Sequence, residues 1–130
     1  MIRLDSYCIY EGNEYIISKL DDGMYKLISR NKNDLNRGFK ETFPKVYVKI
    51  VSLKEITSAY SVSTFCKYKG YRFQIVREKD EKILIHTGDY NLYQQLDLDF
   101  VEKGAYDKWV DRDEIEELWE EKEGIYGFTV

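Results

Sequence analysis

Short runs of alternating hydrophobic and polar residues, separated by turn residues, recur along the chain. Runs of this kind, rich in aromatic and β-branched residues, are typical of antiparallel strands. Gly12 and Gly70 fall in the turns that follow the first run of each half. We expect longer polar loops over residues 30–45 and 88–104, and a fold that is mainly β. The expected strands cover residues 7–10, 14–18, 24–28, 46–51, 65–68, 72–76, 82–86 and 106–110.

The order of these runs is the same in both halves because the sequence contains an internal repeat. Residues 6–34 align with residues 64–92 without a gap, and the match resumes after one inserted residue, with 47–51 facing 106–110. A unit of about 60 residues is only marginally stable alone. We therefore expect two repeated antiparallel β units, over residues 1–62 and 63–130, packed as one body.

Each copy also carries a helix start signal near its end. Ser52-Leu53-Lys54-Glu55 and Asp111-Arg112-Asp113-Glu114 both match the capping box, in which the first side chain and the Glu cap each other's backbone amides. Apolar residues then follow at helical spacing, Ile115 and Trp119 in the second copy. We expect a short helix at the end of each unit, with Ile115 and Trp119 buried and the neighbouring Glu residues in water.

Three short strands, a long loop, a fourth strand and a terminal helical turn within about 60 residues resemble the SH3-like barrels. The resemblance covers nearly all of each copy and implies a small antiparallel barrel in each half. The aromatic and acidic signature of the proline-binding members is not recognisable, so recognition of proline peptides is not implied.

Residues that carry catalysis are sparse in this chain. His86 is the only histidine, and neither a phosphate-binding glycine motif nor a nucleophile with its base accompanies it. Cys8 and Cys66 occupy equivalent positions, which favours a duplicated core residue over a disulfide or a metal pair. Asp97 and Asp99 leave a carboxylate enzyme or a cation site as an alternative. We expect no catalytic site, no metal and no cofactor.

Charge distinguishes the two copies more than any other property. The formal net charge is −4 at pH 7, and the acidic residues concentrate in residues 97–123. This pattern favours either a solvated face that maintains solubility or a surface that attracts a basic partner. Phosphates would be repelled, so we expect no nucleic-acid binding. Since neither a signal peptide nor a long apolar run is present, we expect no membrane partner and a cytoplasmic location.

Tyrosine is the second functional signal. Tyr90 and Tyr93 stand in the long loop of the second copy, where the first copy has Lys32 and Leu35. Tyrosine in a loop beside acidic residues is typical of recognition surfaces. A small, acidic, aromatic-rich chain without catalytic residues resembles the immunity proteins of bacterial toxin systems. That resemblance implies a basic protein partner, a cognate toxin whose active site would be masked.

The candidate partner-binding residues combine this aromatic surface with nearby carboxylates. The alternative function is a structural or adaptor module, such as a phage or accessory protein, that binds a peptide or protein between its two units. The candidate residues are Tyr90, Tyr93, Asp97, Asp99, Glu102 and Trp109.

Overall fold

A computed structural model describes residues 2–130, and it confirms that the fold is mainly β. The strands hydrogen-bond in the order β4-β5-β3-β2-β1-β6-β7-β8-β10-β9, and β11 pairs with β6. The chain divides into two compact units. The first unit contains residues 5–62 and 122–130, and the second contains the N-terminal residues through Leu4 and residues 63–121.

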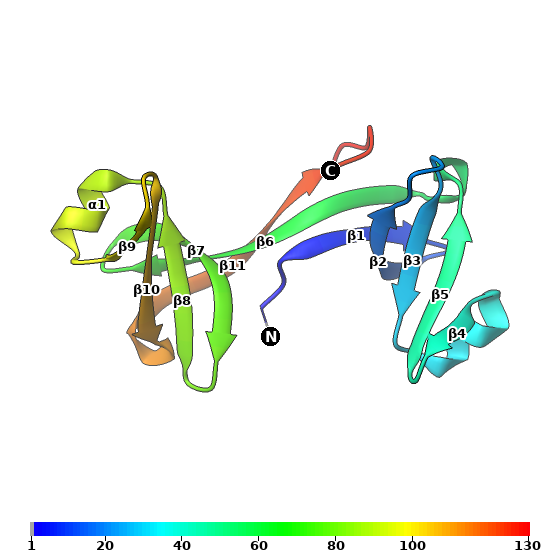
Figure 1. Cartoon of the computed structure of the whole chain (residues 1–130), viewed down its shortest axis with the longest axis horizontal. Coiled ribbons are helices and arrows are strands. Elements are labelled where there is room, and N and C mark those ends of the chain that lie inside the picture. Colours follow the sequence, from blue (N-terminus) through cyan, green and yellow to red (C-terminus); the bar gives the residue numbers. More distant parts are fainter. Residues whose placement is uncertain (1) are drawn as a thin grey trace. The chain divides into compact units, whose positions relative to one another are not determined.

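The first unit is an antiparallel arrangement of β1 to β5 with the beginning of β6 (Figure 1). In the β1–β6 pair Tyr7 lies opposite Tyr60, and in the β1–β2 pair Cys8 lies opposite Tyr15. The elements are β1 (Asp5–Tyr10), β2 (Asn13–Lys19), β3 (Tyr25–Ser29), η1 (Lys32–Arg37), β4 (Lys40–Phe43), β5 (Val46–Val51), η2 (Leu53–Glu55) and β6 (Ser58–Tyr68).

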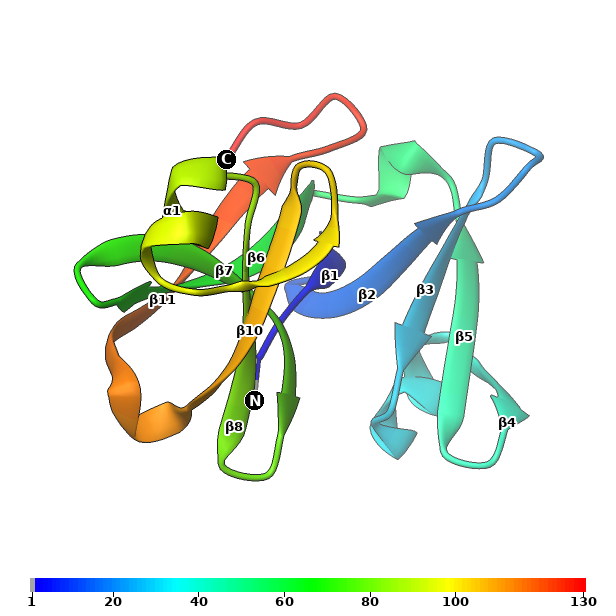
Figure 2. The ribbon, with the colours of Figure 1, turned by 60° about the vertical axis from the view of Figure 1, so that its left-hand side comes forward.

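The second unit is built from the end of β6 and the elements that follow it (Figure 2). Cys66 of β6 lies opposite Phe73 of β7, and Ile85 of β8 lies opposite Lys108 of β10. The elements are β7 (Tyr71–Lys79), β8 (Lys82–Thr87), α1 (Tyr90–Gln95), β9 (Asp99–Glu102), β10 (Ala105–Asp111), η3 (Arg112–Glu114) and β11 (Ile115–Gly124).

Each unit has its own hydrophobic core, made by the inward side chains of its strands. In the first unit the core includes Cys8, Leu27 and Val51, and in the second it includes Cys66 and Ile85. These five side chains have no exposed surface. Alternation along the strands produces this division, because successive residues of a strand point to opposite faces.

The end of the chain completes the first core. Ile125, Tyr126 and Phe128 are half-buried and pack against the cluster that contains Leu27. The ring of Tyr126 lies 4.9 Å from that of Tyr25, centroid to centroid. The segment after β11 therefore belongs to the core of a unit whose strands lie more than 60 residues earlier.

The prediction of a short helix at the end of each unit is wrong. Both capping boxes form, but each supports only a three-residue 3-10 turn. β6 begins three residues after the first turn ends, and β11 begins directly after the second. In a helix Glu116 would face Glu120 four residues on, a destabilising like-charge pair. In β11 the Glu120 carboxylate instead lies 2.9 Å from Arg3, and Glu116 accepts a hydrogen bond from the Gly70 amide.

The apolar residues of β11 also differ from the prediction. Ile115 and Trp119 are half-buried rather than buried, and Trp119 stacks on Phe65 of β6 with ring centroids 6.3 Å apart. Glu116 and Glu120 face water, as predicted. The tryptophan thus covers one face of β6 instead of filling a core.

The two cysteines occupy the cores as predicted, and both thiols are free. Burial raises the pKa of Cys8 and of Cys66 from 9.0 to about 11. Because the thiolate is the reactive form, we expect iodoacetamide at pH 8 to leave the native protein unlabelled. Mass spectrometry should find both cysteines alkylated once guanidinium chloride unfolds the chain. Rapid labelling of the native protein would contradict this burial.

Candidate functional site

The expected loop over residues 88–104 contains α1 and β9, which hold the predicted aromatic residues in place. Asp89 caps α1, since its carboxylate accepts hydrogen bonds from the amides of Asn91 and Leu92. Leu92 and Leu98 are buried in the core of the second unit. α1 lies beside β9 and β10 in both ribbon views (Figures 1 and 2). The segment is therefore fixed at its start and at two apolar positions.

An aromatic cluster joins α1, β9 and β10. Tyr93 stacks on Tyr106, with ring centroids 4.6 Å apart and an interplanar angle of 23°. Phe100 meets Tyr93 and Tyr106 at 6.0 and 5.8 Å, and Tyr90 lies 5.7 Å from Tyr93. Tyr106 is buried, whereas Tyr90 is 53% and Phe100 59% exposed. The cluster is anchored inside the unit and open to solvent outside it.

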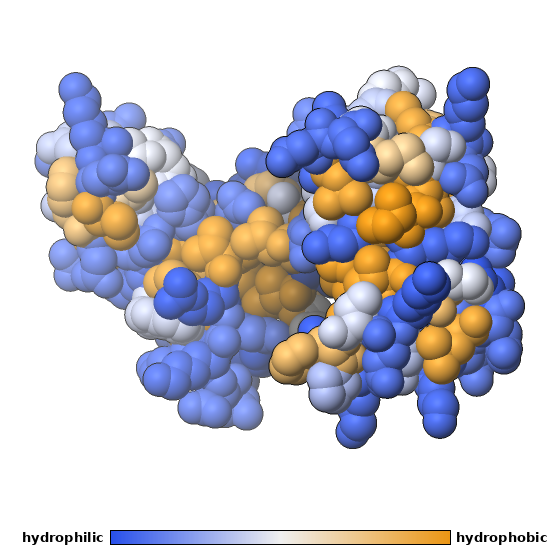
Figure 3. Space-filling model, turned by 45° about the vertical axis from the view of Figure 1, so that its right-hand side comes forward, coloured by the Kyte–Doolittle hydropathy of each residue, from blue (hydrophilic) through white to orange (hydrophobic). Residues whose placement is uncertain are grey.

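β9 also presents an unpaired edge. It ends the strand order, all four of its residues are exposed, and Val101 is 58% exposed. A terminal strand exposes backbone amides and carbonyls that can pair with another chain. In the space-filling view, hydrophobic surface forms separate patches among hydrophilic surface (Figure 3). Apolar residues on an exposed strand edge favour contact with a partner.

Carboxylates accompany this aromatic surface. Asp97 lies in the turn before β9 with a φ of 54°, and Asp97, Asp99 and Glu102 are all exposed. Residues 89–102 include four carboxylates and neither Lys nor Arg. Lys103 directly follows this segment, and Lys108 Nζ lies 3.4 Å from the carbonyl oxygen of Asp97. The residues that we name the β9 surface are Tyr90, Tyr93, Asp97, Asp99, Phe100, Val101 and Glu102.

Trp109 does not belong to the β9 surface. Tyr106 of β10 points into the core, and Trp109, three residues on, points to the opposite face. Trp109 lines a hollow of about 370 Å³ together with Lys79, Lys82 and Asp111. The sequence prediction grouped Trp109 with the tyrosines because it did not consider which face of the strand each residue would occupy.

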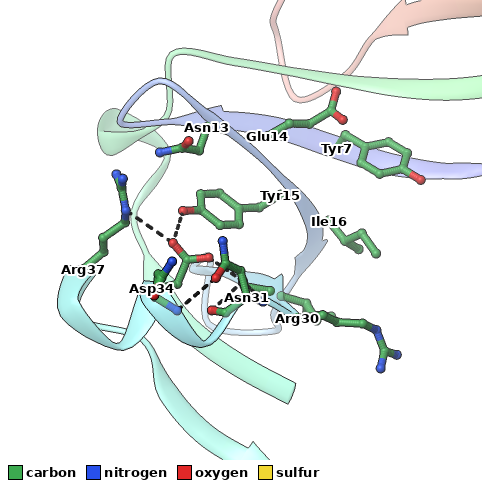
Figure 4. A pocket seen from close by; sticks show the side chains of 12 residues that line it. Tyr7, Asn13, Glu14, Tyr15, Ile16, Arg30, Asn31, Asp34 and Arg37 are labelled. Atoms are coloured by element: carbon green, nitrogen blue, oxygen red, sulfur yellow. Dashed lines mark hydrogen bonds and ion pairs between the residues drawn. The ribbon is translucent and has the colours of Figure 1, made fainter. Parts of the chain in front are cut away.

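Sequence reasoning missed a larger cavity in the first unit. It has a volume of about 540 Å³ and lies among β1, β2, β3 and the η1 segment (Figure 4). At its base Asp34 is 5% exposed. The Tyr15 hydroxyl donates to Asp34 Oδ1 at 2.7 Å, and the Ser29 hydroxyl donates to Oδ2 at 2.5 Å. Arg37 Nε lies 3.4 Å from Oδ1. We name these four residues the Asp34 network.

The Asp34 network surrounds a buried carboxylate with two hydroxyl donors and one guanidinium group. Figure 4 shows Arg37 and Tyr15 directed toward Asp34 from different elements. Burial, and then the hydrogen bond to Asp34, raises the pKa of the Tyr15 hydroxyl well above its ordinary value. The tyrosine therefore remains a proton donor to the carboxylate throughout the neutral range.

The second unit has apolar residues where the Asp34 network has polar ones. In the alignment of residues 6–34 with 64–92, Tyr15 faces Phe73 and Asp34 faces Leu92. Phe73 is 1% and Leu92 8% exposed. The donor and the acceptor of one hydrogen bond are thus both absent from the second unit. This paired difference between the two copies is the sequence signal that could have revealed the cavity.

The described residues give no sign of a metal centre. Over residues 2–130 no group of three or more His, Cys, Asp or Glu side chains is arranged to hold a metal ion. His86, the only histidine, bonds through Nδ1 to Asp107 Oδ1 at 2.5 Å. Within the same residues no helix has both the length and the apolar character needed to span a bilayer.

Comparison with known protein families gives a match over nearly the whole chain. Residues 2–126 match a family model described as "Uncharacterised conserved protein UCP033725". Neither the curated proteins nor the solved structures contain a match to this chain.

Proposed function

The chain belongs to this family of uncharacterised conserved proteins, and we propose that it is a non-enzymatic protein-binding module. Its function in this proposal is that of an immunity protein, which masks the active site of a basic toxin in the cytoplasm of a bacterial cell. The observation that carries the proposal is the β9 surface, where exposed aromatic rings stand among carboxylates in a segment, residues 89–102, that contains neither Lys nor Arg.

The aromatic part of this surface supports tight binding. Binding energy at interfaces concentrates in a few large, rigid side chains that fit into pockets of the partner. Phe100 and Tyr90 project from a buried base formed by Tyr106, so little conformational entropy is lost when they are covered. The free edge of β9 adds backbone groups that a partner strand can pair with.

The acidic part supports the choice of a basic partner. Asp97, Asp99 and Glu102 lie on or beside the exposed strand, and their combined field attracts Lys and Arg side chains. Basic active sites that bind phosphate or nucleic acid carry such side chains. Carboxylates that pair with them occupy the place of the substrate's negative charge.

We also propose that the two units are copies of one SH3-like unit. The orders β1-β2-β3-β5-β4 and β6-β7-β8-β10-β9 correspond element by element. Lys49 Nζ lies 2.9 Å from the Arg37 carbonyl oxygen, and Lys108 Nζ lies 3.4 Å from that of Leu96, so each binds the loop before its strand. On this proposal Lys40 of β4 has its counterpart in Asp99 of β9, and the partner surface arose by charge reversal.

Reversing the charge of Asp97, Asp99 and Glu102 together, each to Lys, should abolish immunity. Loss of desolvated ion pairs costs on the order of 2–5 kcal/mol each, and rim pairs cost little, so we expect at least a tenfold weaker complex. The measurement is growth of bacteria that express a basic toxin found to bind this protein, together with wild type or the variant. The association rate of the purified wild-type protein with the purified toxin should also increase at low salt.

The matched control reverses Lys32, Lys40 and Lys45, three exposed residues of the first unit, to Glu. This variant should protect cells as well as wild type does. Protection by the variant with Lys at 97, 99 and 102, together with failure of the control, would overturn the assignment to β9.

A second candidate function, an adaptor, is supported by Phe43 of the other terminal strand, β4, which is 70% exposed. Two partners bound at once, on β4 and β9, would favour it.

A further inference from the structure

The two carboxylates that line the cavity of the first unit already accept hydrogen bonds, whereas the Arg37 guanidinium is partly exposed. Both oxygens of Asp34 accept hydrogen bonds from hydroxyl groups, and Glu14, which also lines the cavity, accepts one from the Tyr60 hydroxyl. Arg37 touches Asp34 through Nε, and 42% of its side chain is exposed. Arg30 has no ion pair with any of residues 2–130, but Figure 4 shows its side chain directed away from Arg37. A ligand that fits this cavity must supply acceptors.

One wall of the cavity is apolar. Tyr7, Ile16 and Ile28 lie side by side across β1, β2 and β3, because Tyr7 is opposite Ile16 and Ile16 is opposite Ile28. All three are half-buried. Figure 4 shows Tyr7 and Ile16 on one side of the cavity and Arg37 on the other. Side chains of this kind suit an apolar group about the size of a leucine side chain.

The charges of the lining select the kind of acceptor. Arg30 and Arg37 are matched by Glu14 and Asp34, so the lining is close to neutral. A doubly charged phosphate would meet two carboxylates at short range. A carboxylate brings one negative charge and two oxygens in a plane, which match the planar N–H groups of a guanidinium.

The second unit indicates that the Asp34 network is not needed for folding. It fills the matching positions with Phe73 and Leu92, both buried, and it forms a complete core. Buried ionic clusters are often no more stable than apolar residues of similar volume. In the first unit the carboxylate instead holds the Arg37 side chain at the mouth of the cavity through the contact between Nε and Oδ1.

We propose that the cavity of the first unit binds a single carboxylate group attached to an apolar body. Arg37 binds the carboxylate, Asp34 is a positioning residue for Arg37, and the Tyr7–Ile16–Ile28 wall receives the apolar group. The carboxylate comes either from a free small acid or from an acidic residue of a peptide. This site is distinct from the β9 surface and carries a function beyond the proposed immunity.

Nuclear magnetic resonance titration of the full chain tests this site. N-acetyl-L-leucine should shift the side-chain amide signals of Asn31 and Asn33, two residues of the lining, with saturation in the millimolar range expected for a ligand of about 12 heavy atoms. N-acetyl-L-leucinamide, which lacks the charge, and inorganic phosphate should produce no saturable shift. The capped peptide acetyl-Leu-Glu-Leu-amide distinguishes the sources: tighter binding than N-acetyl-L-leucine indicates a peptide, and weaker binding a free acid.

Two variants make the test specific. Arg37→Gln should weaken binding of N-acetyl-L-leucine at least tenfold. The double variant Tyr15→Phe with Asp34→Leu, which copies the second unit, should keep its native spectrum and lose binding. The proposal would be overturned if N-acetyl-L-leucinamide bound as tightly as N-acetyl-L-leucine. It would also be overturned if the folded double variant bound N-acetyl-L-leucine as tightly as wild type, or if neither carboxylate probe gave a saturable shift. The variant with Lys at 97, 99 and 102 should bind the probe normally, so this result is independent of the toxin test.

Discussion

A chain that ends at Glu123 will have a destabilised first unit, although every strand from β1 to β5 is intact. The lost segment contributes Ile125, Tyr126 and Phe128 to that core, and the Ile125 amide donates to the Ala59 carbonyl at 3.1 Å. Three half-buried apolar side chains at about 1 kcal/mol each, with a ring contact and a hydrogen bond, amount to about 3–5 kcal/mol. Small domains have only about 5–15 kcal/mol of stability in total.

Urea denaturation followed by circular dichroism measures this loss. Both tryptophans, Trp109 and Trp119, belong to the second unit, so their fluorescence reports on that unit. If the halves unfold in one transition, as the sequence predicts, both signals will shift together. Removing only Thr129 and Val130, which are exposed, should change neither signal. Equal midpoints for the long deletion and for wild type would show that the tail adds nothing to the core.

The eight predicted strands are present because their alternation is uninterrupted and their turns are marked, whereas β4 and β9 lie in segments that were predicted as loops. Gly12 and Gly70 adopt φ values of 80° and 85°, a conformation that glycine adopts readily. The strand predicted over residues 46–51 has the same limits in the structure. Local sequence and tertiary packing agree in these segments, so periodicity was sufficient.

The end of the chain was not predictable from periodicity, because its apolar spacing suits two structures. Ile115 and Trp119 are four residues apart, which places them on one face of a helix and equally on one face of a strand. The capping box favours a helical start and does form, but it fixes only one turn. Pairing with β6 and ion pairs to Arg3 and Arg72 decide the outcome, and these contacts come from distant residues.

The candidate sites were predictable to different degrees. Tyr90 and Tyr93 differ visibly from their counterparts in the other copy, and the structure brings both into the aromatic cluster. Asp34 appears in the sequence as one more charged residue of a polar loop. Its burial depends on Tyr15, a donor 19 residues away, and only comparison with Phe73 and Leu92 reveals that the pair changes together.

Single changes in the Asp34 network should be far more costly than a matched pair of changes. Asp34→Leu alone leaves the Tyr15 hydroxyl and the Arg37 guanidinium without their partner, and we expect a loss of about 3–5 kcal/mol. Tyr15→Phe alone removes one donor to a charged acceptor, at about 1.5–3 kcal/mol. The two together recreate the apolar pair that the second unit packs with Phe73 and Leu92.

The double variant should therefore lose less stability than the sum of the single losses, with a coupling of about 1–3 kcal/mol. Urea denaturation of wild type, both single variants and the double variant measures this coupling directly. Phe73→Tyr in the second unit is the matched control: its new hydroxyl would be placed near Leu92 with no carboxylate to accept its proton, so it should destabilise. Strictly additive losses at Tyr15 and Asp34 would mean that the two side chains stabilise the first unit independently, and that the apolar pair of the second unit is no substitute for them.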